Sequence, residues 1–210
     1  LKALADLDYI KLEKKQILRD SYHQITTKQN ADKKLTSEQM TALKNIEIAQ
    51  HQGKQKFLLY GVTGSGKTQI YIEMALKARA LGKQALILVP EIVLTGQLVT
   101  SFKEYFTDDV AVIHSRLSVG ERNDTFWRIR TKQIGIIIGA RSALFAPFED
   151  LGLIVMDEEH DSSYKQDESP RYHSHVIIEK MAEIYHATLI MGSATPTLES
   201  YYIAKIADYD

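Results

Sequence analysis

One run of this sequence has the residue types and spacing of a phosphate-binding loop. Residues 61–68 read Gly-Val-Thr-Gly-Ser-Gly-Lys-Thr and fit the pattern G-x-x-x-x-G-K-[ST] between an apolar run and a helical pattern. The glycines allow backbone N–H groups to turn toward phosphate oxygens, and the amino end of the helix adds positive potential. Lys67 would reach the β and γ oxygens, and the Thr68 hydroxyl would ligate Mg²⁺. The predicted nucleotide-binding residues are therefore Gly61, Val62, Thr63, Gly64, Ser65, Gly66, Lys67 and Thr68.

A second run that could carry chemistry is acidic. Residues 157–160 read Asp-Glu-Glu-His and follow the apolar residues 153–156, at the carboxyl end of a predicted strand, where open α/β sheets bind ligands. Asp157 can hold Mg²⁺, and Glu158 can polarise a water molecule that attacks a phosphate. A solvated acidic turn is the alternative. The phosphate-binding loop in the same sheet favours catalytic roles for Lys67, Asp157 and Glu158.

Six short apolar runs must position these residues. They span residues 57–60, 85–89, 110–113, 134–138, 153–156 and 188–191. None alternates with polar residues, which indicates strands buried on both faces, and helical patterns between them indicate crossover connections. The sequence therefore predicts an α/β fold, a mainly parallel, doubly wound sheet with helices on both faces. One helix is expected to begin after Thr36, with Gln39 completing a capping box.

Composition excludes several classes of protein. The chain has 210 residues, enough for one large domain, and its 44% hydrophobic and 25% charged residues are ordinary for a globular protein. No apolar run approaches the ~20 residues needed to cross a bilayer, so no membrane partner is expected. The net charge of -1 means that any polyanion site must be local. The absence of cysteine excludes disulfides and thiolate zinc sites and fits a cytoplasmic protein.

Two segments are expected along the chain. Residues 1–25 carry apolar residues at helical spacing and residues 26–34 are polar, so residues 1–34 are predicted to be an amphipathic helix and a linker. Residues 35–210 are predicted to form the nucleotide-binding lobe. Because the chain begins at Leu1 and ends without a closing pattern, we expect it to be part of a longer protein.

The acidic run resembles the second motif of the superfamily 2 DNA helicases. Further stretches between about Leu35 and Tyr202 are similar, in order and spacing, to the primosomal helicases of that superfamily: residues 58–68, 89–97, 114–127, 139–147, 157–173 and 192–196. The resemblance implies a first RecA-like lobe that binds ATP and Mg²⁺ in an ATP-hydrolysing helicase or translocase of the replication-restart primosome. It implies forked and single-stranded DNA, primosome proteins and single-strand-binding proteins as partners. The family's second lobe, N-terminal DNA-binding domain and zinc module fall outside this chain, which is expected to be monomeric.

The same resemblance implies roles for individual residues. DNA contacts would come from Pro90, Glu91, Thr95, His114, Arg141, Ser142, Tyr164, Lys165, Arg171 and Tyr172, and coupling of nucleotide to DNA from Ser193, Ala194 and Thr195. Gln39 would read adenine, although its capping box explains it without a nucleotide. Arg141 could instead form a surface ion pair, and His114 could be a satisfied strand-end histidine. Thr195 could be the N-cap of a following helix.

The sequence departs from the family pattern at three places. Residues 93–97 read Val-Leu-Thr-Gly-Gln, Ala140 replaces an expected Thr, and residues 174–176 read Ser-His-Val where the family usually has Ala-Arg-Asp. Contacts of that Arg and Asp cannot be carried over. His160, His173 and His175 lie nearby without cysteine, so no zinc site is expected in this chain.

Two other functions fit the phosphate-binding loop. One is another P-loop phosphotransferase, a kinase or a GTPase, although the guanine-binding pattern Asn-Lys-x-Asp is absent. The other is a nucleotide-dependent DNA-binding switch without turnover, because superfamily 2 enzymes complete the γ-phosphate site with arginines of a second lobe. We expect the isolated chain to bind Mg-ATP weakly and to unwind nothing.

Overall fold

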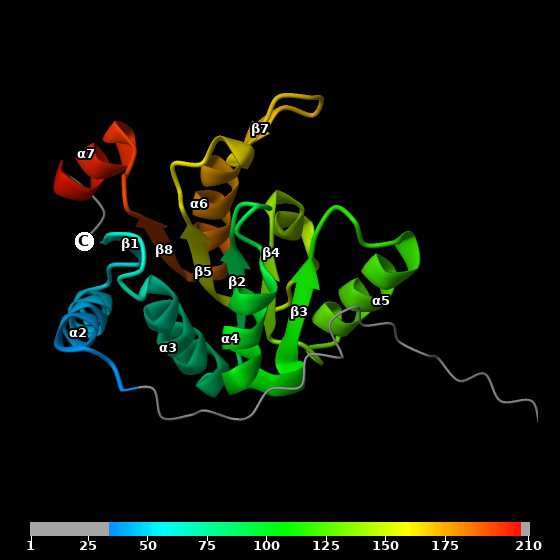
Figure 1. The fold of residues 1–210 in the computed structure, drawn as a ribbon, viewed down its shortest axis with the longest axis horizontal. Helices are drawn as coiled ribbons and strands as arrows, with labels where there is room; N and C mark the ends of the chain where they lie inside the picture. The colour runs from blue at the N-terminus through cyan, green and yellow to red at the C-terminus, as the bar shows by residue number, and fades with distance from the viewer. Residues whose placement is uncertain (1–33, 207–210) are drawn as a thin grey trace, which may run out of the picture.

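The computed structural model describes residues 34–206 and contains a six-stranded parallel sheet (Figure 1). Its strands are β1 (Lys56–Tyr60), β2 (Gln84–Leu88), β3 (Val110–Ile113), β4 (Ile136–Gly139), β5 (Leu151–Asp157) and β8 (Thr188–Ser193). They lie in the order β1-β8-β5-β2-β4-β3, and every neighbouring pair is parallel. All six apolar runs therefore form strands, and the predicted doubly wound α/β fold is confirmed.

Helices and one small hairpin connect these strands. The helices are α2 (Ser37–His51), α3 (Lys67–Ala80), α4 (Gly96–Phe106), α5 (Val119–Arg130), α6 (Ser174–Tyr185) and α7 (Leu198–Ile206), with 3-10 turns at Thr107–Asp109, Arg141–Phe145 and Ser162–Tyr164. An antiparallel pair, β6 (Lys165–Gln166) and β7 (Tyr172–His173), projects from the carboxyl edge of the sheet between β5 and α6 (Figure 1).

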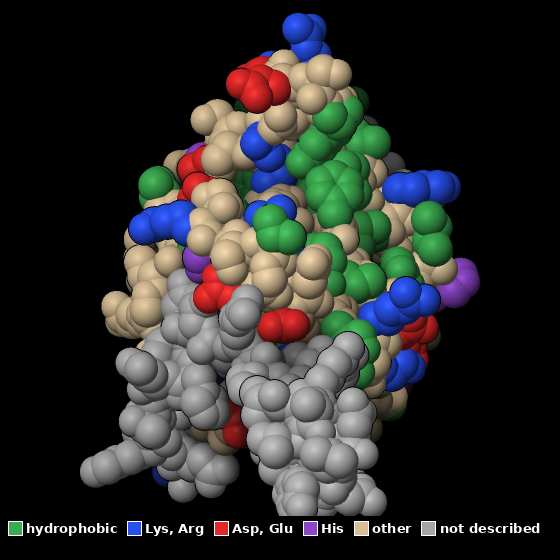
Figure 2. Space-filling model, turned by 90° about the vertical axis from the view of Figure 1, so that its right-hand side faces the viewer, with side chains coloured by type: hydrophobic (Ala, Val, Ile, Leu, Met, Phe, Trp, Pro, Cys, Tyr) green, Lys and Arg blue, Asp and Glu red, His purple; other side chains and the backbone are tan. Residues whose placement is uncertain are grey.

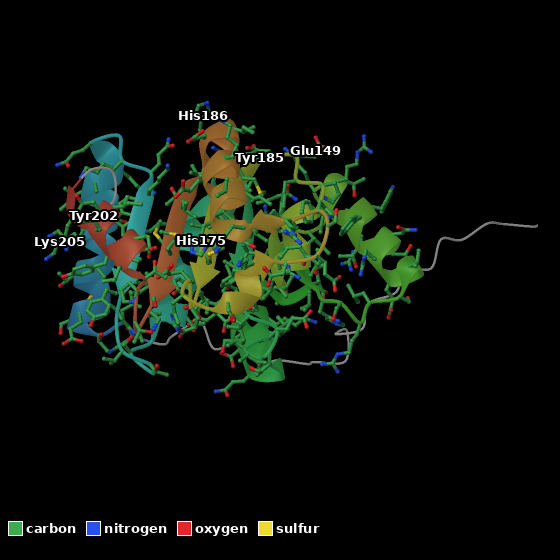
Figure 3. The ribbon with its side chains drawn as sticks, turned by 90° about the horizontal axis from the view of Figure 1, so that it is seen from above. Glu149, His175, Tyr185, His186, Tyr202 and Lys205 are labelled. Atoms are coloured by element: carbon green, nitrogen blue, oxygen red, sulfur yellow. The ribbon has the colours of Figure 1, made fainter. Side chains whose placement is uncertain are left out.

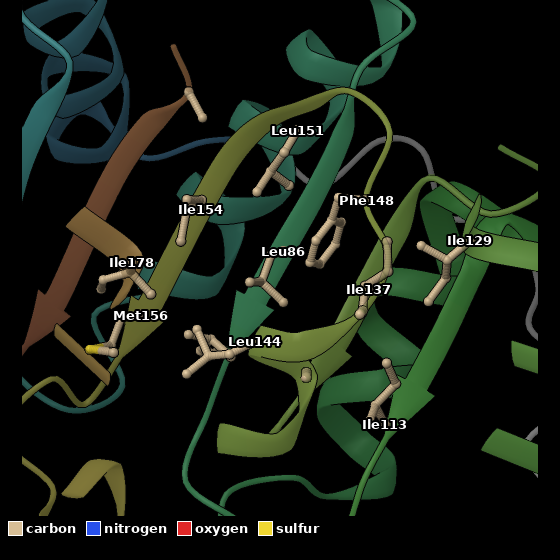
Figure 4. Packing of buried hydrophobic residues seen from close by; sticks show 14 of the residues in the cluster. Leu86, Ile113, Ile129, Ile137, Leu144, Phe148, Leu151, Ile154, Met156 and Ile178 are labelled. Atoms are coloured by element: carbon tan, nitrogen blue, oxygen red, sulfur yellow. The ribbon is translucent and has the colours of Figure 1, made fainter. Parts of the chain in front are cut away.

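Two hydrophobic layers cover the two faces of the sheet. On one face, α2, α3 and α4 pack against alternate strand residues such as Ala85 and Ile87. On the other face, α5 and α6 pack against the intervening strand residues, whose side chains point in the opposite direction. Figure 4 shows this second layer, where Leu86 lies beside its register partners Ile137 and Ile154 on the neighbouring strands. Because both faces are buried, the strands read as continuous apolar runs.

The sheet topology brings the two candidate runs together. Parallel strands end at one edge, so the loop after β1 and the acidic residues after β5 lie on the same side of the sheet. Only β8 separates β1 from β5, and β8 pairs with both. Residues almost a hundred positions apart in sequence thus meet at one site.

One sequence interpretation is wrong in detail. The helix after the last strand begins at Leu198 and not at Pro196, because the Thr197 hydroxyl accepts the Ser200 amide; Thr195 is therefore not its N-cap.

The helix and linker predicted for residues 1–34 lie outside the described residues, apart from Lys34. Within residues 34–206, no helix is long and apolar enough to cross a membrane.

Candidate functional site

The loop between β1 and α3 has the geometry that its glycines suggest. Gly64 and Gly66 have φ angles of 80° and 82°, and Gly66 is the N-cap of α3, so the first amides of the helix face the loop. The Lys67 side chain is only 8% exposed, and its Nζ donates to the Gly61 carbonyl oxygen at 2.8 Å. The ammonium is thus folded back inside the loop, where phosphate oxygens would bind.

The acidic run lies directly opposite this ammonium. Glu158 Oε1 is 4.0 Å from Lys67 Nζ. Glu158 also has a φ angle of 49°, a left-handed conformation that is uncommon for a non-glycine residue and that clusters at functional sites. The structure therefore brings together Lys67, Asp157 and Glu158, the three residues for which sequence predicts catalytic roles.

Two tyrosines hold Asp157, and neither was predicted to do so. Tyr71 Oη donates to Asp157 Oδ1 at 2.8 Å, and Tyr164 Oη donates to the Asp157 backbone oxygen at 2.7 Å. Gly192 on β8 makes room for this, because a Cβ there would overlap Tyr71 Oη. A glycine within an apolar strand run was the available sequence signal for this close approach.

Burial raises the pKa of Asp157, and the neighbouring Glu158 carboxylate adds to the effect, while Tyr71 and Lys67 oppose it. The carboxyl thus protonates at a higher pH than an ordinary Asp. A nearby cation would favour its charged form. This chemistry fits Mg²⁺, which takes one or two protein ligands and completes its shell with water and phosphate oxygens. Among residues 34–206 no group of three or more His, Cys, Asp or Glu side chains is arranged to hold a metal ion.

Gln39 makes two kinds of contact in the structure: one within its capping box and one with the phosphate-binding loop. It completes the predicted capping box with Thr36, and its Nε2 also donates to the backbone oxygens of Ser65 and Gly66, each at 3.3 Å. Gln39 thus connects the start of α2 to the phosphate-binding loop. Its reading of adenine stays a prediction.

Glu159 is the buried residue whose role the sequence did not suggest. It is 1% exposed and accepts hydrogen bonds from three groups: His175 Nε2 at 3.0 Å, the Thr197 amide at 2.8 Å and Ser200 Oγ at 3.0 Å. The carboxylate therefore joins the acidic run to the start of α6 and the start of α7. His175, which stands at a departure from the family pattern, has its partner here, near the middle of the molecule, whereas His186 lies beyond the far end of α6 (Figure 3).

Of the predicted coupling residues, Ser193 contacts the last residue of the acidic run. Ser193 Oγ is 2.8 Å from His160 Nδ1 and accepts the Thr195 amide at 3.1 Å. Ser193 is buried, Ala194 half-buried and Thr195 exposed. The segment is thus tied to the acidic run through Ser193, beside the Glu159 contacts.

Protonation of Glu159 should weaken the fold. Burial disfavours its charge, but the hydrogen bonds from His175, Thr197 and Ser200 lower its pKa below the ordinary 4.5. A lowered folded-state pKa stabilises the protein above the unfolded value, and this contribution is lost as pH falls through the folded value. We expect Glu159→Gln to cost about 1–3 kcal/mol at neutral pH, or about 2–12 °C in melting temperature. Thermal unfolding followed by circular dichroism measures this.

Glu149→Gln is the matched control for that measurement. Glu149 is exposed and lies near Tyr185, at the opposite end of α6 from His175 (Figure 3). Its side chain forms a 3.9 Å ion pair with Arg130, and its backbone amide, which the substitution leaves in place, donates to Gln84. The melting temperature of Glu149→Gln should therefore equal that of the unchanged protein. Equal melting temperatures for Glu159→Gln and Glu149→Gln would contradict a stabilising role for the Glu159 contacts.

Most of the predicted DNA-contacting residues lie along the same edge, after β2, β3, β4 and β5. Thr95 caps α4, with its Oγ1 3.4 Å from the Leu98 amide nitrogen, and His114 Nδ1 accepts the Arg116 amide at 3.2 Å. Burial and the nearby Arg116 lower the pKa of His114. Lys165 and Arg171 are exposed on the β6-β7 hairpin. Figure 2, which views the side carrying β3 and α5, shows a band of hydrophobic side chains bordered by Lys and Arg.

Arg141 binds backbone oxygens at this edge, and among the described residues no ion pair of Arg141 is seen. Its Nη1 donates to the backbone oxygens of Ser163 and Lys165, and its guanidinium carbon lies 5.8 Å from the centre of the Tyr172 ring. The guanidinium thus ties the turn after β4 to the start of the β6-β7 hairpin.

Two predicted DNA contacts do not reach the surface. Tyr164 is 1% exposed, because its ring fills the core beneath the hairpin and its hydroxyl binds the Asp157 carbonyl oxygen. Pro90 is buried where β2 ends, and its carbonyl oxygen accepts the Val93 and Leu94 amides. The DNA contacts predicted for these two side chains are therefore wrong, and both side chains have structural roles instead. Ser174, at another departure from the family pattern, donates to the Tyr164 carbonyl oxygen at 2.7 Å.

Comparison with known proteins agrees with this geometry. The family model described as "Type III restriction enzyme, res subunit" matches residues 32–198. The chain is 46% identical to the replication restart protein PriA of Bacillus subtilis over an alignment that covers all of it, and 47% identical to that of Haemophilus influenzae over 81% of it. It spans 26% and 23% of these relatives, about a quarter of their length.

Solved structures support the fold. The structure of RecG bound to a three-way DNA junction matches 84% of this chain and 23% of that one, with a TM-score of 0.61 and 25% identity. The Type ISP restriction-modification enzyme LlaGI, solved with a DNA substrate mimic, matches 79% of this chain with a TM-score of 0.53 and 16% identity, which shows the fold alone. The chain therefore belongs to the family described as Type III restriction enzyme, res subunit, has the RecA-like fold of a first motor lobe of the superfamily 2 helicases, and is similar to replication restart protein PriA.

Proposed function

We propose that this chain is the ATP-binding first lobe of a DNA helicase or translocase that acts in replication restart. The observation that carries the proposal is the meeting of Lys67 and Glu158, 4.0 Å apart, at the edge where the phosphate-binding loop and the acidic run converge. This pairing places a phosphate-binding cation beside a candidate general base. The PriA relatives support the choice of DNA as the substrate that the motor moves along.

Each group in the site would have its own role in ATP hydrolysis. The loop amides and Lys67 would bind the β and γ phosphates of ATP, and Glu158 would orient and polarise the attacking water. Thr68 and Asp157 would hold Mg²⁺, which neutralises charge on the phosphates. Tyr71 fixes one oxygen of Asp157 and leaves the other for the cation or its water.

A short chain of contacts supports coupling of this site to DNA. Tyr164 Oη binds the Asp157 carbonyl oxygen, and the residues on either side of Tyr164, Ser163 and Lys165, bind Arg141 at the edge of the sheet. A shift of the hairpin on DNA would therefore act on the backbone of the residue that holds Mg²⁺. Coupling by Ser193, Ala194 and Thr195 would act on the acidic run through a second contact, between Ser193 and His160.

The whole protein's setting follows from its relatives and is part of the proposal. A cytoplasmic replication-restart protein would act on forked and single-stranded DNA together with primosome and single-strand-binding proteins. A second lobe would supply the arginines that complete the γ-phosphate site. A nucleotide-dependent DNA-binding switch is the second candidate, because the 210-residue chain contains one such lobe.

Phosphate release tests the proposal. We expect the full-length protein that carries this lobe to hydrolyse Mg-ATP faster with single-stranded or forked DNA than without it. We expect the 210-residue chain alone to bind a fluorescent ATP analogue weakly and to unwind no duplex. A hydrolysis rate that is the same with and without DNA would contradict a DNA motor. ATP binding without turnover in the full-length protein would favour the switch. Robust unwinding by the chain alone would contradict its assignment as a single lobe.

A further inference from the structure

We infer that a hollow beside the β6-β7 hairpin is a seat for one unpaired base of single-stranded DNA, stacked on Phe145. The hollow has a volume of about 420 Å³ and is lined by Glu91, Ser115, Ala140, Arg141, Ser142, Phe145, Ser163 and Tyr172. This volume is within the range of small-molecule sites. The inference rests on the proposed DNA-binding function and assigns a base contact to a residue for which sequence reasoning predicted no role.

Phe145 presents an aromatic surface at the rim of the hollow. It is 57% exposed, although its neighbours Leu144 and Ala146 are buried in the core. Its ring meets Tyr172 edge to face, with ring centres 5.5 Å apart, while Arg141 lies over Tyr172 itself. Tyr172 is thus committed to contacts within the protein, and Phe145 keeps more than half of its surface open beside it. Stacking on such a ring is how proteins bind bases without selecting a sequence.

The polar groups of the hollow suit a base better than a phosphate. The Glu91 carboxylate repels phosphate but can accept a hydrogen bond from the amino group of cytosine, adenine or guanine. Arg141, the cation of the hollow, already donates to two backbone oxygens. Ser142 Oγ is buried and, within the described part of the chain, has no hydrogen-bond partner. Rotation of the Ser142 side chain toward the hollow would let a polar edge of a bound base supply one.

Cations lie on both sides of the hollow, where the phosphates next to a seated base would lie. An adjoining hollow of about 150 Å³ shares Glu91 and Ser115 with the first and adds Arg116. Another, along the hairpin, shares Tyr172 and adds Lys165 and Arg171, together with Asp167, which pairs with Lys165 at 3.2 Å. An aromatic seat with a cation on each side matches the alternation of base and phosphate along a single strand.

Two oligonucleotides separate base contacts from backbone contacts. Fluorescence anisotropy would measure binding of the 210-residue chain to about twelve deoxycytidines and to an abasic strand with the same number of phosphates. We expect Phe145→Ala to weaken deoxycytidine binding by about 5- to 150-fold and to leave abasic binding unchanged. Phe145→Leu, which keeps an apolar side chain without a ring, should lose most of the same preference. Ile184→Ala, exposed near the far end of α6, is the control.

Three results are distinguishable. Loss of the base preference in both Phe145 variants, with circular dichroism melting unchanged, supports the seat. Equal weakening of both oligonucleotides, or none, overturns the seat and leaves DNA binding by the backbone intact. Failure of the unchanged chain to bind either strand overturns the proposed DNA-binding function, and the seat with it.

Discussion

Replacing Glu158 with Gln lowers ATP hydrolysis by the full-length protein about 10²- to 10⁴-fold while nucleotide binding persists. Gln keeps the shape of Glu158 but cannot accept a proton from the attacking water. The residue lies 4.0 Å from Lys67 Nζ and is not needed to hold the phosphates, since the loop amides and Lys67 do so in our proposal. Steady-state phosphate release with saturating single-stranded DNA measures turnover. Titration with a fluorescent ATP analogue measures binding by the 210-residue chain.

Two further variants serve as comparisons for Glu158→Gln. Lys67→Ala should lose nucleotide binding as well as turnover, because the ammonium inside the loop would be missing. Glu149→Gln, at the opposite end of the sheet, should behave like the unchanged protein. Turnover at the normal rate in Glu158→Gln would remove Glu158 from the mechanism, even if Lys67→Ala failed to bind.

The sequence predicts the sheet well because its signal is local and strong. A parallel strand buried on both faces reads as a nearly continuous apolar run, and residues 85–88 of β2 show this in four consecutive apolar letters. The phosphate-binding loop is predicted for a similar reason: glycine, lysine and threonine at fixed spacing between a strand and a helix leave few alternatives. Both features depend on neighbours in sequence, so one chain is enough to find them.

The missed parts of the site depend on contacts that sequence spacing does not encode. Tyr71 and Asp157 are 86 positions apart and meet because β5 lies beside β8, where Gly192 leaves room for the ring. Glu159 reads as one more acidic residue in a polar run, yet it is only 1% exposed, because the starts of α6 and α7 bring three donors to it. A pattern of residue types cannot distinguish these two carboxylates from exposed ones.

The resemblance assigned DNA contacts to two side chains that are buried in the structure. Tyr164 and Pro90 lie in the loops where DNA contacts were predicted, but each is turned into the protein. Tyr172 and Phe145 meet edge to face with their ring centres 5.5 Å apart, and Phe145 is the one that is exposed. An aromatic-rich loop can therefore be found by sequence, but which ring faces outward depends on how the hairpin packs on the turn after β4.

Replacing Gln84 with Met should destabilise the protein by about 3–5 kcal/mol, or about 6–20 °C in melting temperature. Gln84 is fully buried at the amino edge of the sheet, opposite the nucleotide site. Its Nε2 donates to the backbone oxygens of Ile129 and Ile134 at 2.9 and 3.0 Å, and its Oε1 accepts the amides of Glu149 and Asp150 at 2.9 and 3.4 Å.

The size of the expected loss follows from the number of backbone groups that one side chain satisfies. Met has nearly the length of Gln and fills the same space, so little of the loss would come from a cavity. The groups that Gln84 binds lie at the end of α5 and in the connections before β4 and β5. Met would remove the Gln84 hydrogen bonds to the Ile134 oxygen and to the Glu149 and Asp150 amides, while the Ile129 oxygen would keep the Lys132 amide as a donor. Urea unfolding of Gln84→Met, beside the exposed Gln133→Met as control, measures the difference. Equal midpoints would mean that water or backbone shifts replace all four bonds, and Gln84 would then contribute packing alone.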